Sequence, residues 1–289
     1  MQKKAIRYIC ALTALALALT LTGCGAKEPD PHEGMVYVNT GVDMEWIDEA
    51  EGVAASDFDA ADFSSDGNIV SYNGEEYESS LGVDVSFYQG EIDWEAAAAD
   101  GVEFAMIRCG FRGSSEGDMF VDEQFENNIK GALAAGIRVG VYFFSQSTGA
   151  VEAAEEALFV LDLIDGYDVT MPVAFDWEPL SDSRSDSVSG EEVTAAAVVF
   201  CEMVKDAGYD PCVYFFRRLG YYDYDLSRLA DFDFWVGSPG TAPDFYYAHS
   251  IWQFSFTGVI DGIDGDVDLD LAFTPVPQPE PSPTGTSGK

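Results

Sequence analysis

Between residues 80 and 273 the chain alternates short apolar runs with longer stretches of helical period, and this alternation restricts the fold more than any other feature. The apolar runs predict eight strands, at Gly82–Phe87, Phe104–Cys109, Ile137–Phe144, Met171–Trp177, Cys212–Phe216, Phe232–Val236, Ser250–Ser255 and Val267–Ala272. Helical stretches lie between the early strands, at Trp94–Asp100, Val121–Ala135, Ala150–Ile164 and Glu191–Ala207. Such alternation favours a parallel sheet with crossover helices, and eight strands allow closure into a barrel. We predict an α/β fold: a TIM-like modified barrel of five βα units followed by three strands with few helices.

The first residues are typical of a targeting segment. A basic start is followed by an apolar run of about 14 residues, shorter than the roughly 20 that a membrane-spanning helix needs. The run ends in Leu-Thr-Gly-Cys24, which resembles a bacterial lipobox. That resemblance implies a signal peptide over 1–23, lipid on Cys24, and a position on the extracellular face of the bacterial cytoplasmic membrane. The alternative is an ordinary signal peptide with a chance cysteine.

Residues 24–79 are acidic and have no sustained apolar period. Fifteen Asp or Glu and one Lys occupy positions 25–80. We interpret 24–79 as a lipidated acidic tether, because so charged a segment buries too little apolar surface to offset its ordering entropy. A small docking segment around Val36–Ala60 is the alternative. Residues 80–273 form the predicted barrel domain, and 274–289, rich in Pro, Ser, Gly and Thr, form a predicted disordered tail.

Composition excludes several kinds of chemistry. The net charge of −38 argues against nucleic-acid binding, which needs Lys and Arg to neutralise phosphates. With only His32 and His249 in the chain, a histidine-based triad and a zinc site are not expected, and acid–base work falls to carboxylates. No cofactor or metal is expected, and we expect a monomer. Besides Cys10 and Cys24, the cysteines are Cys109, Cys201 and Cys212. Buried free thiols are the favoured state, with a Cys201–Cys212 disulfide as the alternative.

The clearest candidate site is Asp176-Trp177-Glu178, at the end of an apolar run. Side chains alternate along a strand, so the two acids point to one side, roughly 6.6 Å apart along the strand. Glycosidic bond cleavage needs one carboxyl group to protonate the leaving oxygen and a second to manage the oxocarbenium-like centre. Taken alone, the pair is equally consistent with a solvated strand end.

Further acids lie on the first and last predicted strands. Asp84 lies near the end of the first strand and Asp268 lies on the last, and these strands are neighbours in a closed barrel. The two acids are therefore expected to approach each other and the Asp176–Glu178 pair. Crowded carboxylates raise the pKa of at least one member, which keeps an acid protonated near neutral pH. We interpret Asp266 and Asp270 as surface or capping groups.

Several motifs, in order along residues 80–273, resemble glycoside hydrolase family 25, the muramidases (lysozymes) of bacteria and phages. They are Asp84-Val-Ser with Gln89-Gly90 and Ile92-Asp93-Trp94, Gly140-Val-Tyr-Phe-Phe, Asp176-Trp-Glu178, Ile251-Trp-Gln253 and Gly262-Ile-Asp-Gly-Asp-Val-Asp268. The resemblance implies cleavage of the β-1,4 bond between N-acetylmuramic acid and N-acetylglucosamine in peptidoglycan glycan strands. It implies Glu178 as general acid, Asp176 as the carboxylate that steadies the reacting centre, and Asp84 and Asp268 as supporting acids. Asp176 either attacks the sugar or orients the substrate's own 2-acetamido group, and its place on the same strand as Glu178 favours the second version.

Aromatic side chains at strand ends are candidates for sugar binding, because pyranose rings have apolar CH faces. Tyr142 matches a family tyrosine near the reacting sugar, and Tyr214, Trp235 and Trp252 are further candidates, each with core packing as the alternative. Arg108 ends the second strand and either balances the acids from within the barrel or faces outward.

The sequence departs from the family pattern at three places. Phe143 stands where many members have His, Gly237-Ser238 replaces a more usual Ala after the Trp-hydrophobic pair, and Asp270 stands where Asn is common. Two functional alternatives remain: a catalytically inactive wall-binding lipoprotein, whose signature would be loss of a central acid, and a hydrolase of another amino-sugar polymer.

Overall fold

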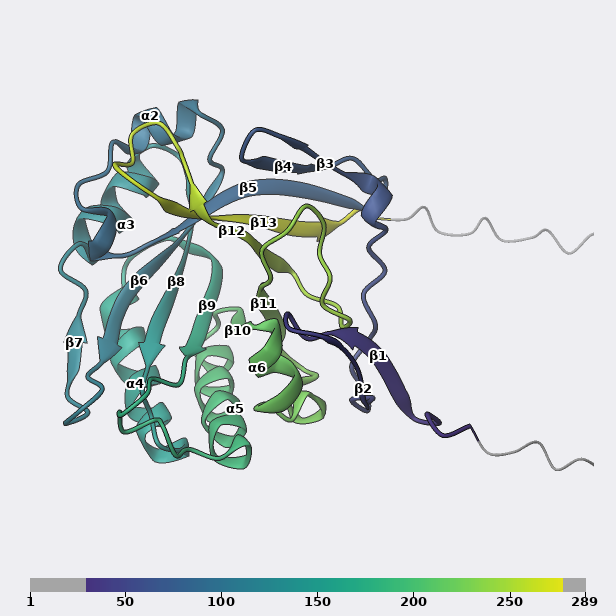
Figure 1. The fold of residues 1–289 in the computed structure, drawn as a ribbon. Helices are drawn as coiled ribbons and strands as arrows, with labels where there is room; N and C mark the ends of the chain where they lie inside the picture. The colour runs from purple at the N-terminus through teal and green to yellow at the C-terminus, as the bar shows by residue number, and fades with distance from the viewer. Residues whose placement is uncertain (1–29, 278–289) are drawn as a thin grey trace, which may run out of the picture. The chain divides into compact units, whose positions relative to one another are not determined.

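The computed structural model describes residues 30–277, so the signal peptide, Cys24 and most of the predicted tail lie outside the described residues. Eight of the nine strands of the main sheet form a closed barrel, and the ninth, the short β7 (Met119–Val121), pairs only with β6 (Figure 1). The barrel strands are β5 (Tyr77–Val85), β6 (Phe104–Arg112), β8 (Arg138–Ser145), β9 (Val169–Trp177), β10 (Pro211–Phe216), β11 (Asp233–Gly237), β12 (Ile251–Gly258) and β13 (Val267–Pro275). Pairing of β5 with both β6 and β13 closes the barrel, which confirms the predicted fold class. Every predicted strand is present within a few residues of its predicted bounds.

Helices follow each of the first five barrel strands, as predicted for five βα units. They are α2 (Trp94–Ala99), α3 (Phe125–Ala134), α4 (Ala150–Ile164), α5 (Gly190–Asp206) and α6 (Arg217–Tyr222). The six-residue α6 was not among the predicted helices, because it is short and lies in a run of aromatic and basic residues. Residues 121–124 precede α3 instead of beginning it, because β7 (Met119–Val121) pairs with β6. Within residues 30–277, no helix combines the length and the apolar character that a membrane crossing requires.

The direction of β13 decides where the last acids lie. β5, β6 and β8 to β12 run parallel, whereas β13 is antiparallel to both of its neighbours. The beginning of β13 therefore lies at the same rim as the C-terminal ends of the other strands. Asp268, the second residue of β13, is paired directly with Asp84 near the end of β5. The predicted approach of the first and last strands is thus confirmed.

The barrel is filled by one core and surrounded by another. Inward-facing side chains form a small apolar cluster below the rim, made of Phe104, Met106, Tyr142, Met171, Ala174, Cys212, Tyr214, Trp235, Ile251 and Ala272. The outward faces of the strands pack against the helices in a larger core. Cys109, Cys201 and Cys212 are free and buried, so the Cys201–Cys212 disulfide is not formed. Cys201 instead points its thiol at the Cys212 carbonyl oxygen, 3.7 Å away.

The segment before the barrel is folded, so the prediction of a solvated tether is wrong for residues 36–76. Two hairpins precede the barrel, β1 (Met35–Asn39) with β2 (Met44–Asp48), and β3 (Phe63–Asp66) with β4 (Ile69–Tyr72), joined by the short helix η1 (Ala60–Asp62). Phe58 packs on Phe273, with ring centroids 4.4 Å apart, and Ala55 forms a bridge with Tyr247. The docking alternative was the correct one for this part of the chain. The barrel also begins at Tyr77, before Ser80, and Pro275 still pairs with it, so the predicted tail starts too early.

The scattered apolar residues of this segment explain why it folds. Its strands are four or five residues long, too short for a sustained period. Val36, Val38 and Val70 are buried, whereas Met44 and Trp46 on β2 stay exposed. Phe63, Tyr72 and Tyr77 join Phe58 and Phe273 in one aromatic cluster. Burial of such rings supplies the free energy that the sequence pattern does not reveal.

Candidate active site

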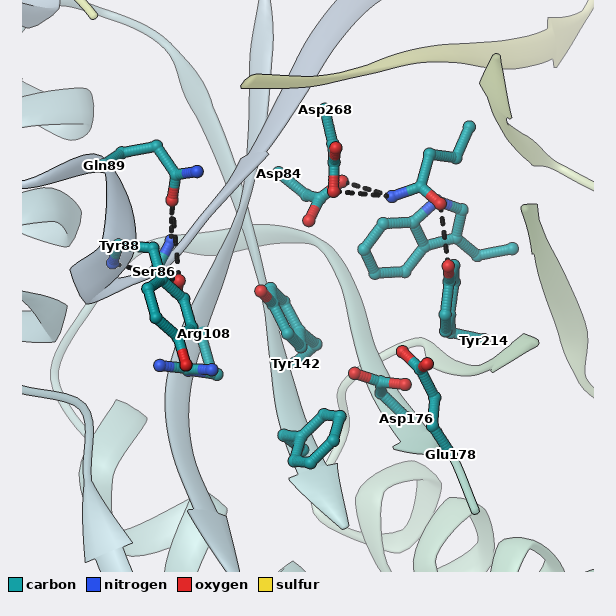
Figure 2. Close-up of a pocket in the computed structure, with 13 residues that line it drawn as sticks. Asp84, Ser86, Tyr88, Gln89, Arg108, Tyr142, Asp176, Glu178, Tyr214 and Asp268 are labelled. Carbon is teal, nitrogen blue, oxygen red and sulfur yellow. Dashed lines mark hydrogen bonds between the residues drawn. The ribbon is translucent and has the colours of Figure 1, made fainter. Parts of the chain in front are cut away.

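A pocket opens at the C-terminal ends of the barrel strands, where active residues of such barrels lie (Figure 2). Its volume is about 200 Å³. It is lined by Asp84, Ser86, Tyr88, Gln89, Arg108, Tyr142, Phe144, Asp176, Glu178, Tyr214, Trp235, Gln253 and Asp268. The four predicted acids therefore share one pocket, together with Tyr142, Tyr214, Trp235 and Arg108 from the predicted binding residues. Among residues 30–277, no group of three or more His, Cys, Asp or Glu is placed to hold a metal ion.

Strand geometry presents the Asp176–Glu178 pair to the pocket. Asp176 is the penultimate residue of β9 and Glu178 follows its last residue, so both side chains point inward. Trp177 points the other way and donates from Nε1 to the Ser147 carbonyl oxygen at 3.1 Å. In Figure 2 the two carboxyl groups lie side by side, across the pocket from Asp84 and Asp268.

The two acids on β9 differ in environment. Burial, reinforced by the charge of Asp268, raises the pKa of Glu178 to about 7. Burial, followed by the charges of Glu178 and Asp84, raises the pKa of Asp176 well above its usual range. Asp176 Oδ1 is buried and has no hydrogen-bond partner among the described residues. A proton donor is thus available near neutral pH, beside an acceptor oxygen that is not yet engaged.

Gln253 organises the two acids on the opposite wall. Its Nε2 donates to Asp84 Oδ2 at 2.6 Å and to Asp268 Oδ2 at 3.4 Å. Its Oε1 accepts a hydrogen bond from Tyr214 Oη at 2.7 Å. Burial raises the pKa of Asp268 to about 6. Gln253 was part of the motif that we recognised in the sequence but was not predicted as a site residue.

Asp270 was predicted at the surface, and that prediction is wrong. Its side chain is fully buried below the pocket, where Oδ1 accepts from Trp235 Nε1 at 2.7 Å and Oδ2 has no hydrogen-bond partner among the described residues. Burial, then the charge of Asp84, raises the pKa of Asp270 well above its usual range. Asp270 and Asp84 therefore lie close enough for the charge of one to affect the pKa of the other. Because Asp270 is two residues from Asp268, strand alternation places both on the inner face, and that signal was available.

Trp252 does not reach the pocket, so its predicted sugar contact is wrong. It is fully buried on the outer face of β12, where Nε1 donates to the Ser238 carbonyl oxygen at 2.9 Å. Its ring packs against Phe63 of the second hairpin, with centroids 5.7 Å apart. The neighbouring Gln253 faces inward, so alternation along β12 accounts for both positions.

Arg108 lies within the barrel rim, which settles the choice left open by the sequence. Its Nε donates to the buried Asp122 Oδ2 at 2.8 Å, and its guanidinium lies 5.1 Å from the ring centroid of Phe87 and 5.4 Å from that of Tyr88. Nη2 is buried and has no hydrogen-bond partner among the described residues. Tyr88, which is 75% exposed, forms the rim beside it. Tyr88 was not predicted as a site residue, because nothing distinguishes an exposed tyrosine from other surface residues in the sequence.

A small glycine keeps the wall around Gln253 in place. The Cβ of any other residue at position 237 would lie 2.9 Å from Tyr214 Oη and 3.0 Å from Gln253 Oε1. This contact gives a physical reason for one of the departures from the family pattern, the Gly237-Ser238 pair after Trp235. Phe143, a second departure, is fully buried in the outer core and does not face the pocket.

Comparisons with known proteins agree with this geometry. Residues 83–263, more than half of the chain, match the model of "Glycosyl hydrolases family 25". The "Autolytic lysozyme" of Clostridium acetobutylicum is 26% identical over 185 residues, which are 64% of this chain and 53% of that protein. "Lysozyme M1" of Streptomyces globisporus is 25% identical over 285 residues, covering 92% of this chain and 90% of that protein. The chain thus spans about half of the first relative and most of the second.

A solved structure shows the same likeness in three dimensions. The structure of a family 25 glycosyl hydrolase from Bacillus anthracis superimposes with a TM-score of 0.54 at 26% identity, over 68% of this chain and 89% of that one. The residues that match the family model include three of the four acids of the pocket, Asp84, Asp176 and Glu178; Asp268 follows the matched range. By this match, the chain belongs to glycosyl hydrolases family 25.

Proposed function

We propose that the chain is a peptidoglycan hydrolase of the lysozyme type, an N-acetylmuramidase that cleaves the β-1,4 bond between N-acetylmuramic acid and N-acetylglucosamine. The observation that carries the proposal is the pocket that gathers Asp84, Asp176, Glu178 and Asp268 at one end of the barrel. Membership of the family and the lysozymes among the relatives support the reaction class.

In the proposed reaction Glu178 donates its proton to the glycosidic oxygen as the bond to the anomeric carbon breaks. A pKa of about 7 keeps much of Glu178 protonated at neutral pH, as a general acid requires. Once the leaving sugar has departed, the ionised Glu178 accepts a proton from the attacking water, which restores the starting state.

The second carboxylate acts on the other side of the broken bond. Asp176 Oδ1 is a buried acceptor without a partner among the described residues, and the N–H of the substrate's 2-acetamido group is a donor of the right kind for it. Such a hydrogen bond favours the ionised form of Asp176 and aims the acetamido oxygen at the anomeric carbon. This supports the substrate-assisted version over direct attack by Asp176.

The reaction is tested with the full chain, because the hairpins before the barrel pack on it. Purified peptidoglycan is digested, and the released fragments are reduced and identified by mass spectrometry, in parallel with Glu178→Gln. We expect fragments that end in reducing N-acetylmuramic acid with the wild type and none with the variant. Fragments that end in reducing N-acetylglucosamine would contradict the assigned bond. Binding of the sacculus without any release would make the barrel a binding scaffold.

We also propose that lipid on Cys24 holds the protein to the outer face of the cytoplasmic membrane. The proposal rests on the basic start, apolar run and Leu-Thr-Gly-Cys24 of the sequence. Mass spectrometry of the mature N-terminal peptide, with membrane fractionation of Cys24→Ala, tests it. A wild-type protein cleaved elsewhere, or an unchanged membrane fraction in the variant, would contradict it.

A further inference from the structure

A second pocket lies beside the catalytic pocket on the same rim of the barrel. It has a volume of about 370 Å³ and is open on one side. We refer to it as the arm pocket; it is lined by Thr40, Gly41, Val42, Phe216, Arg217, Arg218, Leu219, Gly237, Pro239 and Phe256. Its barrel residues come from the C-terminal ends of β10 and β11, from α6 and from β12. The remaining wall is the turn between β1 and β2, which lies outside residues 83–263 that match the family.

The hairpin turn is fixed on the barrel by specific contacts. Asp244 accepts a hydrogen bond from Asn39 Nδ2 at 2.8 Å and also pairs with Arg217 Nη1. Gly41 adopts a φ of +89°, and a side chain there would meet Arg217 Nε at 2.9 Å. On β2, Glu45 accepts a hydrogen bond from Tyr222 Oη of α6 at 2.7 Å. The turn is therefore a built wall of the arm pocket.

The arm pocket continues the catalytic pocket. Phe216 lies between them, with its ring centroid 5.9 Å from that of Tyr214 in the catalytic pocket and 5.3 Å from that of Phe256 in the arm pocket. Gly237 borders both, since a Cβ at this position would meet the Tyr214–Gln253 hydrogen bond and Gly237 also lines the arm pocket. The two pockets are therefore separated only by the wall that Phe216 and Gly237 form.

The two arginines of the arm pocket differ in charge balance. Arg217 is neutralised by Asp244. Arg218 is exposed, and its guanidinium lies 4.8 Å from the ring centroid of Tyr222; within residues 30–277 it has no carboxylate at ion-pairing distance. Burial raises the pKa of Asp223 and the nearby charge of Arg218 opposes this rise, but among the described residues Arg218 forms no ion pair with it. In a chain with 52 acidic and 14 basic residues, the arm pocket thus presents a positive charge without a direct carboxylate partner among the described residues.

We propose that the arm pocket binds the carboxylate-bearing peptide arm of a muramic acid residue next to the bond that Glu178 protonates. The inference rests on the proposed function, because it takes the substrate to be peptidoglycan. Small aliphatic side chains of the arm lie against Phe216, Phe256 and Val42, and a carboxylate of the arm pairs with Arg218. A neutral sugar would satisfy the apolar wall but leave the guanidinium without a counter-charge.

The test compares two substrates that differ only in the arm. Oligomeric glycan strands with their stem peptides are prepared beside the same strands after the peptides have been removed with an amidase. The full chain, Arg218→Gln, Arg218→Lys and Val42→Asp are assayed for kcat/KM on both. Arg228→Gln is the matched control, because Arg228 is an equally exposed arginine on η3 (Leu226–Leu229), which precedes β11 and so lies toward the opposite end of the barrel.

We expect Arg218→Gln and Val42→Asp to lower kcat/KM about two- to fivefold on the peptide-bearing strands only, mostly through KM. Arg218→Lys should keep most of the preference, added salt should reduce it, and Arg228→Gln should leave both substrates unchanged. An equal loss on both substrates would assign the arm pocket to a sugar, and no loss on either would overturn the proposal.

Failure of the inference is kept distinct from failure of the proposed function by a binding measurement. Calorimetric titration of Glu178→Gln with peptide-bearing and peptide-free tetrasaccharides reports the arm pocket without turnover. If the peptide-bearing ligand binds more tightly, and the additional Arg218→Gln substitution removes this difference, peptide binding by the arm pocket is supported. This holds even if the wild type cleaves neither strand. Equal binding of the two ligands overturns the inference whether or not the wild type is an active hydrolase.

Discussion

Two glutamates of this barrel, Glu178 and Glu156, have the same raised pKa and opposite surroundings. Burial raises the pKa of each to about 7. Glu178 lines the catalytic pocket, and among the described residues its carboxylate has no hydrogen-bond or ion-pair partner. Glu156 is fully buried on α4, where its oxygens pair with Arg112 Nε at 2.6 Å and Ser145 Oγ at 2.7 Å.

The two glutamates differ in whether the carboxyl oxygens around them already have hydrogen-bond partners. Around Glu156 the remaining donors of Arg112 are engaged as well, by the Gly117 and Glu152 carbonyl oxygens at 2.8 and 3.0 Å. The cluster is complete, and it joins β6, β8 and α4. Around Glu178 and Asp176 the acceptor capacity is left open toward a pocket. A raised carboxyl pKa alone therefore shows only that the group is buried. A carboxyl oxygen that faces a pocket without a hydrogen-bond partner shows that the group is available for chemistry.

The largest expected effect is the loss of activity in Glu178→Gln. The amide keeps the shape of the side chain and cannot donate a proton to the leaving oxygen, so we expect kcat to fall by about 10³-fold or more. Release of reducing ends from peptidoglycan measures it, and the thermal unfolding midpoint of the variant should not fall. A variant with more than a tenth of wild-type activity would remove Glu178 from the role of general acid.

The opposite outcome is expected for Glu156→Ala. The substitution removes the buried counter-charge of Arg112 and leaves only the more exposed Glu155 carboxylate, 3.3 Å from Nη2, so we expect the fold to be destabilised by about 3 kcal/mol. Denaturant unfolding measures this loss, and kcat of the folded fraction should stay within a fewfold of wild type. If Glu156→Ala unfolds like wild type but loses turnover, the division between a structural and a chemical glutamate is wrong.

The sequence predicts the chemical cluster far better than the structural one. Asp84, Asp176, Glu178 and Asp268 were predictable because strand ends and barrel closure bring them together, whatever the loops do. The Glu156 cluster depends on a helix-to-strand contact whose register no local pattern reveals. The inward positions of Asp270 and Gln253 were also predictable, because strict alternation along β13 and β12 places both side chains on the inner face.

The hairpins before the barrel mark the limit of prediction from local pattern. Phe58 and Phe63 are separated by acids and loops, so their burial depends on a distant partner, Phe273. The charge density that favoured a tether is real, but it lies on the solvent side of short strands. Sequence periodicity reveals a helix or strand that buries one face along its whole length. These hairpins bury only single side chains, so they leave no such pattern.

The pH dependence of stability sharpens the comparison. The pKa of Glu178 is raised in the folded state, so its protonated form favours folding at low pH, and this contribution is lost as pH rises through about 7. Glu178→Gln stays neutral, so it should match wild type near pH 5 and exceed it at pH 8 by on the order of 2 kcal/mol. Glu156 is present in both proteins, so its own titration cancels. Denaturant unfolding at both pH values measures the difference, and equal slopes with pH would mean that Glu178 is solvated in the folded chain.

The smallest expected effect concerns the residue that connects the two regions, Gln146. It follows Ser145, which donates a hydrogen bond to Glu156, and is itself fully buried. Its Nε2 donates to the Glu178 carbonyl oxygen at 2.7 Å, and its Oε1 accepts from Ser185 Oγ at 2.7 Å. Gln146 thus holds the backbone of Glu178 and the loop after β9 in one position relative to β8.

Removal of this amide should impair positioning and leave the chemistry in place. In Gln146→Met the volume is kept and all four side-chain hydrogen bonds of Gln146 are lost, so we expect kcat to fall about tenfold while KM changes less than twofold. The pH at which activity is half maximal should also shift, because the burial that sets the pKa of Glu178 changes when its backbone moves. Ser187→Ala, in the exposed part of the same loop, is the matched control and should behave as wild type. A Gln146→Met variant that loses stability but keeps kcat and its pH profile would place Gln146 with Glu156, as a residue of the scaffold alone.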